Sequence, residues 1–128
     1  MDSLIRNYFM KKIKKENFGQ IKNADIESHG SICNNASGDI VSIFANIKDG
    51  KLSEIKMECG PCDPTAIVAT NIAVDILENR DLEEILSDEK SIIADFERIL
   101  GGKSKAGTEH FKKIIDQLQV LIKDKVKN

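Results

Sequence analysis

The stretch from Val41 to Cys59, VSIFANIKDGKLSEIKMEC, decides the fold. Apolar and polar residues alternate on both sides of Asp49-Gly50, and the apolar members are Val41, Ile43, Ala45, Ile47, Leu52, Ile55, Met57 and Cys59. Such alternation is typical of half-buried strands, and Asp-Gly between two alternating runs indicates a hairpin because both turn positions favour positive φ. The stretch therefore predicts two antiparallel strands.

A helix is predicted directly after the hairpin. Cys59-Gly60-Pro61-Cys62 is followed by Asp63, which can act as N-cap, and by Pro64, which suits the first helical position. The next residues form an apolar stripe at helical spacing: Ala66, Ile67, Ala69, Thr70, Ala73, Val74 and Leu77. The two cysteines are thus expected between a strand and the start of a helix.

The remaining segments are predicted to be mostly helical. Downstream we expect a short helical turn around 82–86, a helix capped by Ser87 that ends at Gly101-Gly102, and a last helix capped by Thr108 after a polar loop. Upstream, the spacing of apolar residues predicts an amphipathic helix over 3–16, and residues 17–38 are expected to be an extended connector.

This order predicts an α+β domain, because strands and helices are segregated along the chain and parallel βαβ units are absent. A small antiparallel sheet of about three strands is expected, with the N-terminal helix and three C-terminal helices on one face. Residues 1–128 are expected to form a single domain, in which 1–28 are the N-terminal helix and connector and 29–128 the core.

Composition and charge argue against several classes of function. The 128 residues include 19 Lys or Arg and 21 Asp or Glu, a net charge of −2 that provides no basic field for nucleic acid. No apolar run is long enough to span a membrane, and the N-terminus lacks a signal-peptide pattern, so a cytoplasmic protein is expected. With only 2 histidines and no visible catalytic triad or phosphate-binding loop, we do not expect an enzyme.

The chain has 3 cysteines, Cys33, Cys59 and Cys62, and an odd number in a reducing compartment favours metal binding or thiol chemistry over structural disulfides. Cys59-Gly-Pro-Cys62 resembles the active-site tetrapeptide of thioredoxins. Thioredoxins usually carry a Trp before the first cysteine and a cis proline well downstream, whereas this chain has Glu58 there and no proline after Pro64. The thioredoxin fold is therefore excluded, but a redox-active dithiol stays open.

A second resemblance covers residues 29–122. It rests on a series of short motifs in a fixed order: His29-Gly30, Ser37-Gly38-Asp39-Ile40, the Asp49-Gly50 hairpin, Ile55-Lys56-Met57, Cys59-Gly60-Pro61, Ala66-Ile67-Val68-Ala69, Leu100-Gly101-Gly102 and Glu109-His110. The series resembles the NifU/IscU family of iron-sulfur cluster assembly scaffolds. The resemblance implies three thiolates, an Asp and a His that converge at one end of the sheet, where thiolates suit the cluster and weaker ligands let it leave.

The chain departs from the family pattern at two of the three cysteine positions. Ser37 stands at the first and Phe111 at the third, while either Cys59 or Cys62 matches the second. The resemblance leaves a candidate ligand set that suits iron or zinc: Cys33, Asp39, Cys59, Cys62 and His110. Each also has a plain structural interpretation, such as a loop thiol for Cys33, a turn residue for Asp39 and a surface residue for His110.

The resulting hypothesis is a divergent scaffold that transiently binds an iron-sulfur cluster, iron or zinc. By resemblance it would receive sulfur from a cysteine desulfurase and pass its cargo to apo-protein acceptors, as a monomer or weak homo-oligomer. One alternative is a partner-binding module that assembles no cluster and has a structural zinc site or no metal. Another is a thiol-disulfide redox dithiol formed by Cys59 and Cys62.

Overall fold

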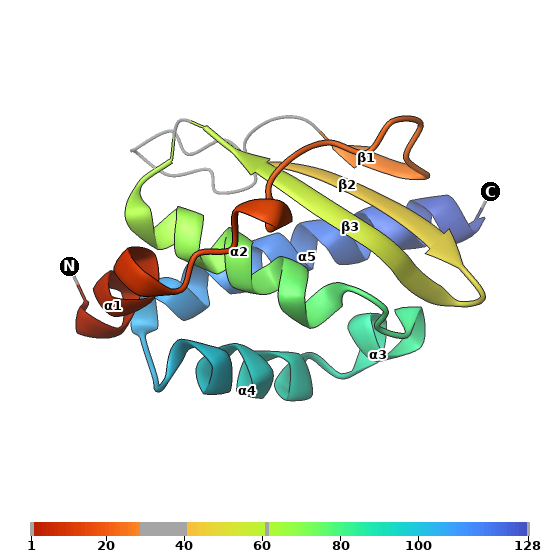
Figure 1. The fold of residues 1–128 in the computed structure, drawn as a ribbon. Helices are drawn as coiled ribbons and strands as arrows, with labels where there is room; N and C mark the ends of the chain where they lie inside the picture. The colour runs from red at the N-terminus through yellow and green to blue at the C-terminus, as the bar shows by residue number, and fades with distance from the viewer. Residues whose placement is uncertain (1, 29–40, 61, 128) are drawn as a thin grey trace.

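A computed structural model describes residues 2–28, 41–60 and 62–127 of the chain. The elements are α1 (Ser3–Lys11), a 3-10 turn η1 (Lys15–Asn17), β1 (Ile26–Ser28), β2 (Val41–Lys48), β3 (Lys51–Cys59), α2 (Pro64–Leu77), α3 (Leu82–Ser87), α4 (Glu89–Leu100) and α5 (Lys105–Lys127). The three strands form one antiparallel sheet in the order β1-β2-β3. All helices lie on one side of it (Figure 1), so the predicted α+β class is confirmed.

The helices form two tiers beneath the sheet. Helices α2 and α5 lie next to the strands, and α4 lies farther away (Figure 1). The core between the sheet and the first tier is built from the alternating apolar residues of β2 and β3 and from most of α2, which is buried on nearly every side. Among the described helices, none is both long and apolar enough to cross a membrane.

The hairpin has the predicted turn. Asp49 and Gly50 adopt φ values of 54° and 75°, the left-handed conformation that this tight turn requires. The register pairs Val41 with Cys59, so the last residue of β3 lies opposite the first residue of β2. Phe44 is 1% exposed although the alternation places it on the face away from the helices, where a polar environment was expected.

Helix α2 also begins as predicted. The side chain of Asp63 accepts a hydrogen bond from the backbone N–H of Ala66 at 2.9 Å, and Pro64 occupies the first turn. This cap satisfies an N–H group that would otherwise lack a partner, and it fixes where the chain turns from strand to helix. Cys59 is therefore the last residue of β3, and Cys62 lies directly before the cap of α2.

The N-terminal helix is shorter than predicted because Asn71 competes for the backbone that follows it. Helix α1 ends at Lys11, and the buried Asn71 side chain accepts from the Lys14 N–H at 3.0 Å and donates to the Lys14 carbonyl at 2.8 Å. Those two groups are then unavailable to continue a helix. Tyr8 donates its hydroxyl to the same Asn71 oxygen at 3.2 Å, and Asn17 donates to the Asn71 carbonyl at 2.9 Å.

Burial of Tyr8, with a smaller contribution from the charge of Asp75, raises the pKa of its hydroxyl to about 12 from an ordinary value near 10. The stabilisation that depends on neutral Tyr8 is complete below pH 10 and is lost as the pH rises toward 12. We expect the free energy of unfolding to fall more steeply over this range in the wild type than in Tyr8→Phe, by on the order of 1 kcal/mol. Urea titrations of both chains from pH 8 to 11.5 measure this difference, and parallel curves would contradict it.

The last helix begins four residues before the predicted start. Ser104, and not Thr108, is its cap: the Ser104 hydroxyl accepts from the Gly107 N–H at 3.1 Å, and its carbonyl accepts from the Thr108 N–H at 2.9 Å. Gly107 lies inside the helix, at a position where a Cβ would approach the Ile5 side chain to 3.0 Å. It is therefore a close-approach glycine, whereas the sequence pattern suggested a loop glycine.

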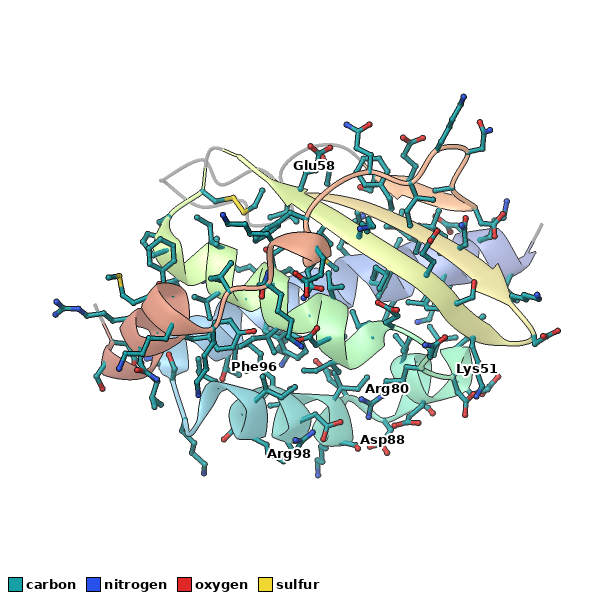
Figure 2. The ribbon with its side chains drawn as sticks, in the orientation of Figure 1. Lys51, Glu58, Arg80, Asp88, Phe96 and Arg98 are labelled. Carbon is teal, nitrogen blue, oxygen red and sulfur yellow. A yellow bond between two sulfur atoms is a disulfide. The ribbon has the colours of Figure 1, made fainter. Side chains whose placement is uncertain are left out.

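Helices α3 and α4 are joined as predicted, with a shift of one residue at the cap. Asp88 caps α4 by accepting from the Ser91 N–H at 3.3 Å, whereas Ser87 belongs to α3. Arg80, labelled in Figure 2, links the two helices by ion pairs to Glu84 and Asp95. Its hydrogen bond holds the pKa of the Asp95 carboxyl below the usual range. Helix α4 ends at Leu100, and its C-cap Gly101 has φ 104°.

Candidate functional site

Cys59 and Cys62 are joined by a disulfide where β3 ends and α2 begins, with their Cα atoms 5.8 Å apart. The two sulfurs lie at the upper end of α2 in Figure 2. Both cysteines are half-buried and pack against the hydrophobic core. In the reduced state, two thiols this close can bind the same metal ion, whereas the disulfide cannot act as a thiolate ligand.

A pocket of about 370 Å³ opens beside the disulfide. It is lined by Phe18, Gly19, Glu58, Cys59 and Ile67. The side chain of Glu58, labelled in Figure 2, comes from the end of β3. Glu58 and Cys59 also border a second pocket of about 220 Å³ together with Ser42 and Gly60. Cys59 thus borders open space on the surface.

Two of the residues that line this pocket, Phe18 and Gly19, come from the N-terminal segment. Gly19 donates its N–H to the Met57 carbonyl at 3.0 Å, and Lys56 donates its ammonium to the Glu16 carbonyl at 2.8 Å. These bonds hold Glu16 and Gly19 alongside β3. The same segment is fastened to α2 through Asn71, so the pocket depends on contacts between distant parts of the chain.

Thr70 lies beneath Cys59. Its side chain is buried, its hydroxyl donates to the Ala66 carbonyl at 2.7 Å, and the same oxygen is 3.9 Å from the Cys59 sulfur. A hydroxyl at this distance can turn toward a thiolate once the disulfide opens, because hydroxyl hydrogens rotate to suit their surroundings. Thr70 is therefore positioned to stabilise the reduced form of Cys59.

His110 is half-buried near the start of α5, and its Nδ1 lies 3.0 Å from the Ala106 carbonyl oxygen. A carbonyl can only accept, so Nδ1 donates the hydrogen in this contact, and in the neutral ring Nε2 then carries the lone pair. Nε2, which is buried, is consequently the atom that would bind a metal. This tautomer is compatible with the ligand role that the family resemblance implies for His110.

Phe111 is completely buried and stacks on Phe96 of α4, with ring centroids 4.5 Å apart and planes at 16°. Phe96 is labelled in Figure 2 among the helices, away from the disulfide at the end of the sheet. The residue at the family's third cysteine position therefore contributes to the core between α4 and α5.

The described residues include only part of the candidate ligand set. Within residues 2–28, 41–60 and 62–127, no three His, Cys, Asp or Glu side chains form a group that could hold a metal ion. Cys33 and Asp39 lie outside the described residues, as does Ser37. The structure thus brings together Cys59 and Cys62, and the participation of Cys33, Asp39 and His110 stays a prediction.

Comparison with known proteins finds relatives in the family that the sequence motifs resemble. No family model matches the chain. Two proteins of Archaeoglobus fulgidus, the iron-sulfur cluster assembly scaffold proteins IscU 1 and IscU 2, are each 29% identical to it over 89 residues. The match covers 70% of this chain and 54% of each relative, so the chain spans about half the length of these relatives.

Solved structures agree on the fold. The N-terminal NifU-like protein of Brucella abortus superposes with a TM-score of 0.61 at 14% identity, covering 99% of this chain and 94% of its own. A candidate iron-sulfur cluster assembly scaffold protein for the SUF system of Fervidobacterium islandicum AW-1 gives 0.62 at 20% identity, covering 95% and 96%.

The chain is IscU/NifU-like in both sequence and fold. The resemblance inferred from the ordered motifs is thereby confirmed. The IscU/NifU-like fold accounts for the antiparallel sheet, the central helix after the cysteine turn and the long final helix, all of which the motifs spanned in order.

Sequence inspection missed the residues that surround Cys59. Glu58 was noted only as a departure from thioredoxins, and Thr70 and Ile67 were assigned to the apolar stripe of the helix. Phe18 was placed in a connector. A signal was available for Asn71, since an amide inside an otherwise apolar helix needs a buried partner.

Proposed function

We propose that this chain is a divergent iron-sulfur cluster assembly scaffold, which holds iron and sulfide transiently and passes them to apo-proteins. The observation that carries the proposal is the pair Cys59 and Cys62 at the end of β3, in a chain that is IscU/NifU-like in sequence and fold. Thiolates are the ligands that iron-sulfur clusters prefer. The cluster is cargo here, since a scaffold must release what it binds.

Cys59 and Cys62 are assigned as the principal ligands or sulfur acceptors. His110 is assigned as an auxiliary ligand through Nε2, Asp39 as the weak ligand that keeps the cargo exchangeable, and Cys33 as a replacement for the thiolate absent at Ser37. A set that mixes two or three thiolates with nitrogen and oxygen donors binds iron or zinc less tightly than four thiolates, which suits a carrier.

The chain is proposed to act without catalysing a reaction of its own. A cysteine desulfurase would supply sulfur, apo-proteins would receive the cargo, and the cytoplasm, where thiols stay reduced, is the compartment in which the pair can function. Because the chain spans about half the length of its curated relatives, these partners are part of the proposal.

Anaerobic purification followed by metal and acid-labile sulfide analysis tests the proposal. Iron and sulfide present together in near-equal amounts are the expected result. Zinc without sulfide would instead support a module with a structural metal, and the absence of both would support a redox dithiol. Either of these two results contradicts the scaffold proposal.

A further inference from the structure

Cys59 and Cys62 bind no metal while they are joined, so the pair needs an external reductant before it can carry cargo. We propose that a thiol carrying a positive charge enters the pocket lined by Phe18, Gly19, Glu58 and Ile67 and opens the disulfide by attacking Cys59. Only the consequence for cargo rests on the proposed function, because the exchange itself can be measured without iron.

Access selects the sulfur that is attacked. Cys59 borders the 370 Å³ pocket and also the smaller pocket on its other side. Cys62 stands immediately before Asp63, the residue that caps α2, and among the described residues it lines neither pocket. Thiol-disulfide exchange depends on which sulfur an attacking thiolate can reach in line with the bond.

The reaction proceeds in two exchanges. The thiolate of the reductant forms a bond to Cys59 Sγ, the Cys59–Cys62 bond breaks, and its electron pair leaves on Cys62 Sγ, which takes a proton from water. A second thiolate then attacks the reductant's sulfur in the mixed disulfide and releases Cys59 as a thiolate. Two thiols are oxidised to one disulfide, and the protein gains two electrons and two free thiols.

The lining of the pocket selects the kind of thiol. Phe18 and Ile67 supply apolar walls, and Glu58, the residue before Cys59, is the acidic residue among the described lining. Lys56, two residues earlier on β3, donates to the Glu16 carbonyl and keeps its positive charge, which partly offsets that of Glu58, but among the described residues it does not line the pocket. The carboxylate therefore attracts a thiol with an amino group and repels one with a carboxylate, a difference in local concentration that salt reduces.

Reduction rates with cysteamine and with 3-mercaptopropionate test this inference. Rates are measured on the oxidised 128-residue chain by alkylation and intact mass. The ratio of the two rates is divided by the ratio on the urea-unfolded chain to remove intrinsic reactivity. Because the charges interact through water and Lys56 offsets part of the field, we expect the folded chain to favour cysteamine by a few-fold at low salt.

Glu58→Gln should bring the corrected ratio close to one. Glu54→Gln is the matched control, because it removes a carboxylate from the same strand and should keep the preference. Ile67→Trp, which fills the pocket, should slow both thiols. Tandem mass spectrometry should locate the first cysteamine adduct on Cys59. Equal ratios in the wild type and Glu58→Gln, or an adduct on Cys62, would overturn the inference.

Discussion

Replacing Phe111 with Ala is expected to lower the free energy of unfolding by about 3–5 kcal/mol, the usual cost of removing a large buried ring. The ring is fully buried, and its stacking on Phe96 adds to the loss from burial alone. Val120→Ala is the matched control on the same helix: Val120 is 53% exposed, so the change should cost about 0.5 kcal/mol or less. Urea denaturation of the three chains measures both values.

The companion variant Phe111→Cys places a thiol at the position that the family resemblance aligns with a ligand. Because the side chain faces Phe96 in the core between α4 and α5, the new thiol should destabilise the protein and should not increase the iron it retains. A stable Phe111→Cys chain that binds more iron would show that position 111 is a ligand position, contrary to the structure.

Replacing Asn71 with Ala is expected to release the N-terminal segment from α2. The change removes three hydrogen bonds, to Tyr8 and to both backbone groups of Lys14, and leaves buried polar groups without partners. Each such group costs about 1–3 kcal/mol, so we expect a total loss of about 3 kcal/mol. Asn46→Ala, which removes bonds at an exposed site, should cost less than about 1 kcal/mol.

Hydrogen exchange distinguishes local release from general destabilisation. In Asn71→Ala, the amide of Gly19 should exchange much faster, because its bond to Met57 depends on the placement of the segment that Asn71 holds. Amides in the centre of β2 should keep more of their protection. Equal acceleration in both places would show that Asn71 stabilises the core as a whole and does not specifically fasten the pocket wall.

The sequence predicted the turns and helix starts that adjacent residues determine. The Asp49-Gly50 turn and the Asp63-Pro64 helix start each depend on neighbouring residues, and both were confirmed. The end of α1 depends on Asn71, which lies far away in sequence. The packing reason for a glycine at position 107 is the close approach of Ile5. Such distant contacts leave no periodic trace in the chain.

The candidate site also combines features that neighbouring residues determine with features that depend on distant contacts. The spacing of Cys59 and Cys62 was enough to predict two neighbouring thiols between strand and helix, and the structure joins them. The resemblance aligned Phe111 with a ligand position, but alignment gives residue identity and not the direction of a side chain. The pocket at Cys59 needs Phe18 and Gly19, which reach it only through tertiary contacts.

The most direct test of the central claim is the amount of iron and acid-labile sulfide that the anaerobically reconstituted chain retains and passes to an apo-ferredoxin. The reduced wild type should hold both and transfer them, while Cys59→Ser, Cys62→Ser and the wild type kept in its disulfide form should hold little of either. Retention and transfer by both serine variants at the wild-type level would contradict the assignment of this cysteine pair as the cargo site.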